Sequence, residues 1–344
     1  MLLITNMEVA LEDKILLAHG SGGKLAHELV EKSFVKALVN PLLAKLDDSA
    51  VFDLSGRLAF TTDSYVVSPI FFPGGDIGKL AVCGTVNDLA MSGAKPLYLS
   101  LSFIIEEGLS RSDLEKIVDS TRKAAQEAGV KIVTGDTKVV NRGNADKLFI
   151  NTAGLGMVPE GVNISGDNAR PEDKVILSGT IGDHGIAVLS QREGLSFATQ
   201  LESDCAPLAG MVAEMLAASS NIHCLRDPTR GGLATTLNEL AKQSKVSIRV
   251  EEEKLPVREE VLGACEMLGF DPLYVANEGK LVAIVSAEDA DKVLQAMRGN
   301  RYGKKAVIIG EVGAEHPGRV AMKTFLGASR IIDMLVGDLL PRIC

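Results

Sequence analysis

The sequence has 344 residues, which is enough for two domains of ordinary size. Its formal net charge of −9 argues against a protein that binds the nucleic-acid backbone, which needs clustered Lys and Arg. The longest apolar runs, such as LYLSLSFII, are far shorter than a membrane span, and the N-terminus lacks a basic secretory signal. We therefore expect no nucleic-acid partner and no membrane association.

The five cysteines form no CxxC pair, and their spacings fit no zinc template. An odd number of free thiols is typical of a reducing compartment, so a cytoplasmic location is expected. Cys344, the last residue, has no core in which to be buried, and it is either there by chance or a reactive thiol on a tether. The other four cysteines lie in apolar or mixed stretches, and we expect each to be a small buried side chain in the core. They are Cys83, Cys205, Cys224 and Cys265.

In chain order, the first half mixes strands and helices. Residues 1–42 are a loosely patterned arm, in which the glycine-rich loop HGSGGK precedes a short helix. Long helices are predicted at 76–92 and at 110–129, the second with Ser110 or Ser112 as its cap. Alternating or apolar stretches predict strands at 58–70, 95–105, 130–140 and 147–158.

A connector rich in Pro, Gly and Asp at 159–172 predicts a domain boundary. It divides a first domain at 43–160 from a second at 170–313, and 314–344 is expected to hold two short strands and a mobile tail. Because strands and helices mix without a βαβ repeat, we predict the α+β class with mixed sheets. The second domain should contain helices at 183–193, 205–219, 231–244, 258–269 and 288–299, and strands at 174–182, 246–251, 280–287 and 305–312.

The helix at 76–92 is apolar or small nearly all round, which is typical of a buried helix. It nevertheless carries Asn87 and Asp88. A buried carboxylate needs a hydrogen-bond partner or a cation. A structural hydrogen bond is one explanation for Asp88, and a metal site is the other.

Other aspartates follow strands or open turns, where side chains can reach a shared cleft: Asp47, Asp48, Asp63, Asp136 and Asp227. Each one alone is explained by the frequency of Asp in turns. Carboxylates that converge without His or Cys, however, are the ligands that Mg²⁺ prefers, and Mg²⁺ usually arrives with phosphates. Together with Asp88 they favour a metal site.

Two glycine-rich turns precede helices, HGSGGK at 19–24 and DPTRGGL at 227–233. The first is not a Walker A loop, because Ala18 and Leu25 stand where that motif needs Gly and Ser or Thr. Both turns can still offer backbone N–H groups to an anion. The five histidines form no cluster, so neither a zinc site nor a Ser-His-Asp triad is predicted.

Six motifs occur in the order and spacing of one family: LDDSAV, TTDSYVV, GTVNDLAMSGAKP, TGDTKV, GDHG and DPTRGGL. Through them the chain resembles the aminoimidazole ribonucleotide synthetase and selenophosphate synthetase family over essentially its whole length. A selenophosphate synthetase should carry a reactive Cys or selenocysteine in the glycine-rich loop. Ser21, Gly22 and Gly23 occupy that loop here, and the ending PRIC resembles the hydrogenase-maturation members.

The resemblance implies two α/β domains, a homodimer built through the first domain, and ATP bound with Mg²⁺. It places a catalytic role on Lys138, Glu278 and Cys344. The nucleotide positions that it implies, together with the glycine-rich loop, are Asp48, Asp63, Thr85, Asn87, Asp88, Asp136, Gly22, Gly23 and Lys24. The metal ligands that it implies are Asp48, Asp63, Asp88 and Asp227.

The implied activity is the ATP-dependent dehydration of a carbamoyl group carried on Cys344 to a thiocyanate. The cyanide would serve the Fe(CN)2CO centre of [NiFe]-hydrogenase, with HypF as carbamoyl donor and the HypC–HypD complex as acceptor. Two alternatives stay open. One is a family synthetase that makes a phosphorylated small molecule, and the other is a non-catalytic thiol carrier or scaffold.

Overall fold

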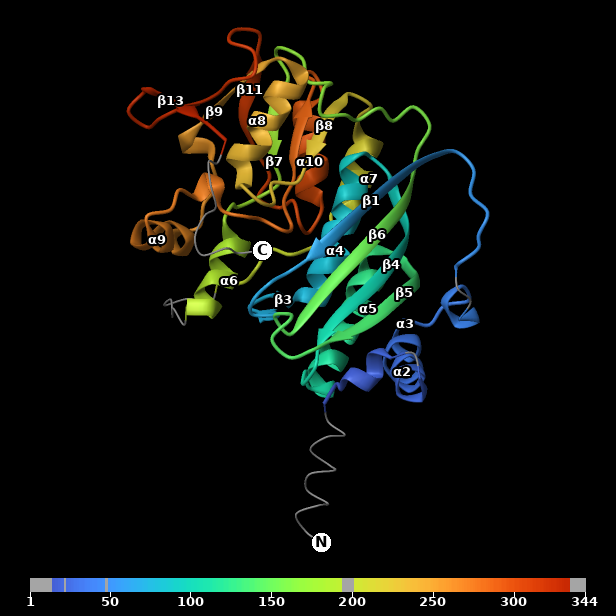
Figure 1. Cartoon of the computed structure of the whole chain (residues 1–344). Helices are drawn as coiled ribbons and strands as arrows, with labels where there is room; N and C mark the ends of the chain where they lie inside the picture. The colour runs from blue at the N-terminus through green and yellow to red at the C-terminus, as the bar shows by residue number, and fades with distance from the viewer. Residues whose placement is uncertain (1–13, 22, 47–48, 194–200, 335–344) are drawn as a thin grey trace.

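The computed structural model describes residues 14–21, 23–46, 49–193 and 201–334. Two α/β domains follow one another along the chain, each built on its own sheet, with helices between the sheets and around the second one (Figure 1). The predicted α+β class with mixed sheets is confirmed. No helix in the described ranges is long and apolar enough to cross a membrane.

The sheet of the first domain has four strands in the order β1-β6-β4-β5. Only β4 and β5 run parallel, and the other two pairings are antiparallel. Helices α4 and α5 cover one face of this sheet, and no layer of the described residues covers the opposite face (Figure 1). The strands are β1 (Arg57–Tyr65), β4 (Lys95–Glu106), β5 (Lys131–Val140) and β6 (Leu148–Val158).

Helix α4 (Ile77–Met91) lies between the two domains. Asp76 caps its first turn by accepting hydrogen bonds from Gly78 N (2.7 Å) and Lys79 N (3.1 Å). One side of the helix belongs to the core of the first sheet, while Ala90 and Met91 belong to a core cluster of the second domain. This double burial explains why the helix is apolar nearly all round.

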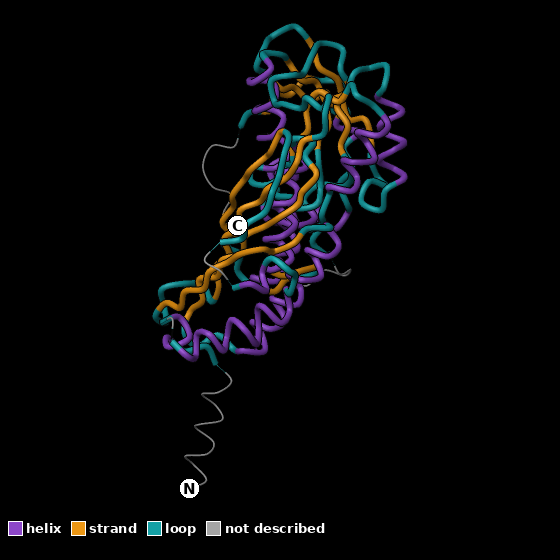
Figure 2. The backbone as a smooth tube through the Cα atoms, turned by 90° about the vertical axis from the view of Figure 1, so that its right-hand side faces the viewer, coloured by secondary structure: helices purple, strands orange, loops and turns teal. Residues whose placement is uncertain are grey.

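Helix α5 (Arg111–Ala128) packs beside α4. It begins at the predicted Ser110, whose hydroxyl accepts from Asp113 N at 3.1 Å, and it ends at Gly129 with a φ of 70°. The arm packs against the β5 side of the sheet as a chain of short helical turns (Figure 2). These are η1 (Leu17–Gly20), α2 (Lys24–Leu29), η2 (Val30–Val35), α3 (Lys36–Leu38) and η3 (Leu43–Lys45).

The second sheet has seven strands in the order β13-β12-β9-β11-β7-β10-β8, and only β12 and β9 run parallel. β12 and β13, which the sequence groups with the tail, form one end of this sheet, with β13 as the edge strand. The strands are β7 (Lys174–Leu177), β8 (Ile222–Arg226), β9 (Ser247–Glu251), β10 (Val282–Val285), β11 (Val307–Gly313), β12 (Val320–Lys323) and β13 (Ser329–Ile332). The helices are α6 (Asp183–Glu193), α7 (Ala209–Ala218), α8 (Gly232–Ser244), α9 (Glu259–Leu268) and α10 (Ala290–Gly299), with short turns η4 (Glu252–Lys254) and η5 (Pro272–Tyr274).

Two local predictions are wrong in detail. The sequence predicts no element over β8, a short strand in which His223 and Arg226 interrupt the apolar pattern. It also predicts a helix from Cys205, whereas α7 begins at Ala209. The segment before α7 is tied to α4, because Leu208 N donates to Asn87 Oδ1 at 2.8 Å.

The four internal cysteines behave as predicted. Cys83, Cys205, Cys224 and Cys265 are buried and free. Burial raises the pKa of the Cys224 and Cys265 thiols to about 11, so both stay protonated. Cys344 lies outside the described residues.

Acidification should destabilise the fold through His184. This ring is fully buried on α6, and burial lowers its pKa from 6.5 to about 4. Between these values the unfolded chain binds more protons than the folded one, so stability present above pH 6.5 is lost as the pH falls toward 4. We expect this residue to remove on the order of 3 kcal/mol of unfolding free energy over that range, measured by denaturant unfolding. In a His184→Asn variant this part of the pH dependence should vanish, and an unchanged dependence would contradict the assignment.

Candidate active site

Three carboxylates from both domains face one another at the cleft. Asp63 lies on β1, Asp88 on α4, and Asp227 directly after β8. Burial, followed by repulsion from Asp88, raises the pKa of Asp227 to about 7. Burial and then the charge of Asp63 raise the pKa of Asp88 as well. Of the aspartates that the sequence predicts to converge, these three interact electrostatically, and their crowding favours a bound cation.

Hydroxyl groups on β1 and on α4 orient two of these carboxylates. Thr61 donates to Asp88 Oδ2 at 2.8 Å, and Thr85 donates to Asp63 Oδ2 at 2.8 Å. The Thr85 hydroxyl is fully buried and also lies 2.5 Å from the Thr152 hydroxyl and 3.1 Å from that of Tyr65. Thr85, expected near the phosphates, thus serves in this structure to fix Asp63.

Asn87 has a different role from the one its motif implies. Its Oδ1 accepts from Leu208 N at 2.8 Å, and its Nδ2 donates to the carbonyl oxygens of Ala206 (3.1 Å) and Glu278 (3.4 Å). The side chain is 2% exposed, so these bonds engage it away from solvent. The structure makes Asn87 a brace between the domains, and its role as a nucleotide ligand stays a prediction.

Glu278 joins the cluster from the second domain. It is half-buried, and burial raises the pKa of its carboxyl well above the ordinary value. The nearby Cys205, Asp227 and Asp63 add to this effect. A carboxyl in such surroundings is a stronger base than an ordinary glutamate, which suits a role in proton transfer.

Asp136 and Lys138 lie at the other edge of the first sheet. Register pairs Asp63 with Thr152, Thr152 with Leu101 and Leu101 with Gly135, the residue before Asp136. Three strand spacings correspond to about 14 Å, so one chain does not bring these residues to the acidic cluster. Instead, Lys138 Nζ forms an exposed ion pair with Asp136 Oδ2 at 2.9 Å, which also holds the pKa of Asp136 below its usual range.

The glycine-rich loop lies at this second edge. A Cβ on Gly20 would stand 2.5 Å from Val139 N of β5, so glycine is needed for the close approach. Gly23 precedes α2, and Lys24 begins that helix. A cavity of about 370 Å³ beside them is lined by Gly20, Asp136 and Lys138, among others. Gly22 and Asp48, two further predicted ligands, lie outside the described residues.

A second cavity, of about 450 Å³, opens beside the acidic cluster. Asp88 and Asp227 line it together with Arg226 and Arg230. In the described ranges, no three acidic, His or Cys side chains are already arranged as a metal site. Mg²⁺ commonly binds through one or two carboxylates and completes its shell with phosphates and water, so the oxygen-only donors of the cluster fit this ion.

Sequence reasoning missed several residues of the site. Tyr65, whose ring packs against Gly84, borders Asp63, and its pKa is raised by burial and by that carboxylate. Asp204 and Lys280 form a buried pair beneath Glu278. Lys280 is only two residues after Glu278, but Asp204 lies in a stretch without periodic pattern or glycine signal, so no local feature marks it.

Two α/β domains with acidic residues gathered between them define the class of two-domain enzymes related to AIR synthase. The N-terminal domain of the AIR synthase related proteins matches residues 46–158, and the C-terminal domain matches residues 170–323. The chain belongs to this family.

Within the family, the chain is similar to the carbamoyl dehydratases HypE, as the sequence resemblance indicated. The HypE of Azotobacter vinelandii is 56% identical over 329 residues, which cover 95% of this chain and 96% of the relative. A crystal structure of the hydrogenase maturation protein HypE in complex with ATP superposes with a TM-score of 0.93 at 52% identity, covering 96% of this chain and 99% of the other. A HypE–HypF complex matches with a TM-score of 0.79 at 53% identity, covering 89% and 99%.

Removing one carboxylate from the cluster should stabilise the metal-free protein. In Asp227→Asn the repulsion from Asp88 and Asp63 disappears, and we expect the free energy of unfolding to rise by about 1 kcal/mol above pH 7 in the presence of a chelator. The gain should shrink as the pH falls below about 7, because Asp227 then takes up a proton. Thermal or denaturant unfolding across this range measures it, and a loss of stability above pH 7 would show that the carboxylates do not repel one another.

Proposed function

We propose that this protein uses ATP to dehydrate a carbamoyl group on Cys344 to a thiocyanate, whose cyanide serves the Fe(CN)2CO centre of [NiFe]-hydrogenase. The observation that carries the proposal is Glu278, a carboxyl with a strongly raised pKa, facing the acidic cluster of a chain 56% identical to a carbamoyl dehydratase. The ATP complex of a HypE with the same fold supports the choice of nucleotide.

The reaction needs a better leaving group than oxide. The carbamoyl oxygen attacks the terminal phosphorus of ATP, ADP leaves, and the carbon now carries phosphate in place of a carbonyl oxygen. Loss of both N–H protons and of the phosphate then yields S–C≡N, so the elements of water depart in the phosphate and the two protons. Glu278 is placed to take a proton from nitrogen, and catalysis rests mainly on positioning.

Asp63, Asp88 and Asp227 would hold Mg²⁺, with Asp48 added by the family resemblance. When bound, Mg²⁺ would neutralise the phosphate oxygens of ATP and relieve the repulsion that raises the pKa values of Asp88 and Asp227. The role of these side chains is to hold the phosphates in place beside Glu278. Thr61 and Thr85 keep two of the carboxylates oriented for this task.

A second copy of the chain would complete the site. Glu278 and the acidic cluster lie toward the β1 edge, whereas Lys138, Asp136, Gly23 and Lys24 lie toward the β5 edge. The uncovered face between these edges exposes large apolar side chains, with Phe60 73%, Leu58 48% and Ile104 41% exposed. A homodimer built through this face would cover them and could bring the β5 edge of one copy to the β1 edge of the other.

The C-terminal end can reach this cleft. Asn238 Nδ2 donates to Ile332 O at 2.9 Å, and Lys242 Nζ lies 3.1 Å from Met334 Sδ, so the last described residues lie along α8. The first turn of α8 follows Asp227 and is about 9–15 Å from these contacts along the helix axis. Ten residues follow Met334, and an extended chain of ten spans at most about 35 Å.

The partners in this proposal follow from the chemistry. A carbamoyl group has to be loaded onto Cys344 by a second enzyme, and the HypE–HypF complex of a similar chain supports HypF as that donor. The thiocyanate then needs a cyanide acceptor, for which the family resemblance names the HypC–HypD complex. The buried free thiols are in keeping with a reducing, cytoplasmic location.

Cys344→Ala should abolish carbamoylation and thiocyanate formation while leaving the fold and ATP binding intact. The expected wild-type result, after incubation with HypF, carbamoyl phosphate and ATP, is a carbamoylated C-terminal peptide that loses one water, detected by mass spectrometry. Cys83, Cys205, Cys224 and Cys265 serve as internal controls because all four are buried. A carbamoyl or cyano mass on one of them in the variant would rule out the tethered mechanism.

Glu278→Gln should bind ATP and accept the carbamoyl group but form thiocyanate about 100-fold more slowly or worse, because the base at nitrogen is lost. Single-turnover mass spectrometry on the loaded protein separates the steps. Unfolding experiments on the same variant provide the control, because a purely structural role would lower stability and spare the rate. Dehydration at the wild-type rate would remove Glu278 from the mechanism.

Phe60→Glu should yield monomers, because a charge on the uncovered sheet face opposes burial there. Sedimentation or light scattering gives the oligomeric state. Met267→Glu is the matched control, since Met267 on α9 is 74% exposed, as Phe60 is 73% exposed, but lies away from this face. A Phe60→Glu protein that remains dimeric would place the second copy elsewhere.

A further inference from the structure

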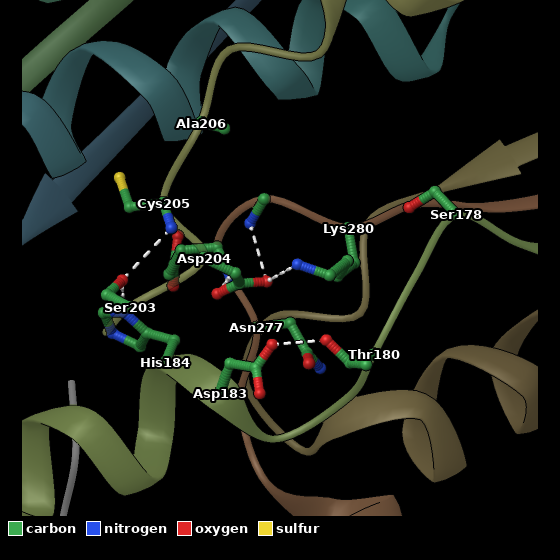
Figure 3. A network of polar contacts seen from close by, with 12 residues as sticks. Ser178, Thr180, Asp183, His184, Ser203, Asp204, Cys205, Ala206, Asn277 and Lys280 are labelled. Atoms are coloured by element: carbon green, nitrogen blue, oxygen red, sulfur yellow. Dashed lines mark hydrogen bonds and ion pairs between the residues drawn. The ribbon is translucent and has the colours of Figure 1, made fainter. Parts of the chain in front are cut away.

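The segment 203–206, drawn in Figure 3, lies between α4 and the loop that carries Glu278, and it forms hydrogen bonds with both. The first domain holds it at both ends, because Ser203 N donates to Pro73 O at 2.8 Å and Asn87 Nδ2 donates to Ala206 O at 3.1 Å. Asn87 is one residue before Asp88 on α4. The segment is therefore tied to the same helix that carries one of the cluster carboxylates.

Asp204 of this segment binds the loop that carries Glu278. Its Oδ1 accepts from Glu278 N at 3.1 Å, and its Oδ2 accepts from Gly279 N at 3.2 Å and from Lys280 Nζ at 2.8 Å (Figure 3). The Asp204 side chain is 2% exposed and that of Lys280 is 10% exposed. Although burial alone would raise it, the charge of Lys280 holds the pKa of Asp204 below its ordinary value. Three donors thus converge on one buried carboxylate.

The backbones of the segment and the loop also touch. A Cβ on Gly279 would stand 1.8 Å from Asp204 O and 3.0 Å from Ala206 N. Glycine is therefore required at this position for the loop to approach the segment so closely. Contact of backbone with backbone leaves the loop little room to slide relative to Asp204.

Two further side chains support this arrangement from the second domain. His184 Nδ1 lies 2.8 Å from the Ser203 hydroxyl, which also accepts from Cys205 N at 3.1 Å. Asn277 Oδ1 accepts from Gly182 N at 2.8 Å, and its Nδ2 donates to Pro228 O at 2.8 Å. Asn277 thereby connects the loop of Glu278 with the turn that carries Asp227. The GDHG motif is part of the same support through Gly182 and His184.

We propose that Asp204 and Lys280 are positioning residues, which fix the backbone of Glu278 so that its carboxyl faces the acidic cluster. The inference rests on the proposed function of Glu278 as the base in dehydration. A buried ion pair contributes little net stability compared with apolar side chains of the same size, so stability does not account for it here. Its distinguishing property is geometric: it fixes two backbone N–H groups next to the reacting carboxyl and joins them to α4.

Asp204→Asn tests this role. Whichever way the new amide turns, its NH2 group faces a donor of the loop, so the loop loses part of its anchor while the size of the side chain is kept. We expect kcat for thiocyanate formation on the carbamoyl-loaded protein to fall by about 10- to 100-fold, with the KM for ATP changed less than about threefold. Such a split is the signature of a misplaced catalytic group rather than of a lost nucleotide site.

Asp173→Asn is the matched control. Asp173 is 4% exposed, accepts from Arg170 N at 2.8 Å and pairs with His223 Nδ1 at 2.7 Å, but it lies at the far end of β7. The substitution removes the same kind of buried carboxylate from the same domain. It should lower stability to a similar degree and leave kcat and KM unchanged.

Combining Asp204→Asn with Glu278→Gln decides whether Asp204 acts through Glu278. If it does, the double variant is as slow as Glu278→Gln alone, whereas an independent effect would multiply the two losses. Should Asp204→Asn fail to fold, Lys280→Met, which leaves the two hydrogen bonds from backbone N–H groups to Asp204 in place, should show a smaller loss in kcat with the same unchanged KM. Wild-type kcat in Asp204→Asn, or multiplied losses in the double variant, would overturn the positioning role. A wild-type protein that forms no thiocyanate would instead overturn the proposed function.

Discussion

Burial raises the pKa values of Asp88 and Asp227, and the charge of Asp63 adds to both effects, although the three residues belong to three elements of two domains. Like charges do not gather unless the surrounding structure holds them, so the cluster has to be imposed by packing elsewhere. The core on both sides of α4 supplies that force. The protein without ligands thus carries a local electrostatic cost that a cation and phosphates can relieve, and binding and conformational order are coupled at this point.

Helix α4 links structure and chemistry because successive residues on it do different work. Thr85 donates a hydrogen bond to Asp63 and orients it, Asn87 accepts a hydrogen bond from the segment before α7, and Asp88 belongs to the acidic cluster. Asn87 also binds the carbonyl oxygen of Ala206, two residues after Asp204, and Asp204 in turn binds the loop of Glu278. Groups from the two domains are therefore positioned relative to one helix. A shift of either domain would change the distances between the reacting groups.

Much of the fold follows from local patterns in the sequence, and the exceptions have physical causes. The long helices and their ends were predictable because α5 has a serine cap and a terminal glycine, and because α4 is apolar all round. The sequence also predicted a group of converging aspartates, of which Asp63, Asp88 and Asp227 interact, whereas Asp136 lies at the other edge of the first sheet. The brace formed by Asn87 and the buried pair of Asp204 and Lys280 were not, since each joins residues more than seventy positions apart and depends on tertiary contact alone. The separation of Lys138 from the cluster depends on strand order, which a linear pattern does not reveal.

The position of Lys138 at one edge of the first sheet and of Asp63 at the other has a genetic consequence. If paired copies each complete the other's cleft, a copy with a defective β5 edge and a copy with a defective cluster would still form one intact cleft between them. Two variants that are each inactive alone would then restore activity when expressed together. Each mixed dimer would have one working cleft of its two, about half of the normal number. Conversely, a copy damaged at both edges would spoil both clefts of any pair that it joins, and its allele would act dominantly over the normal one.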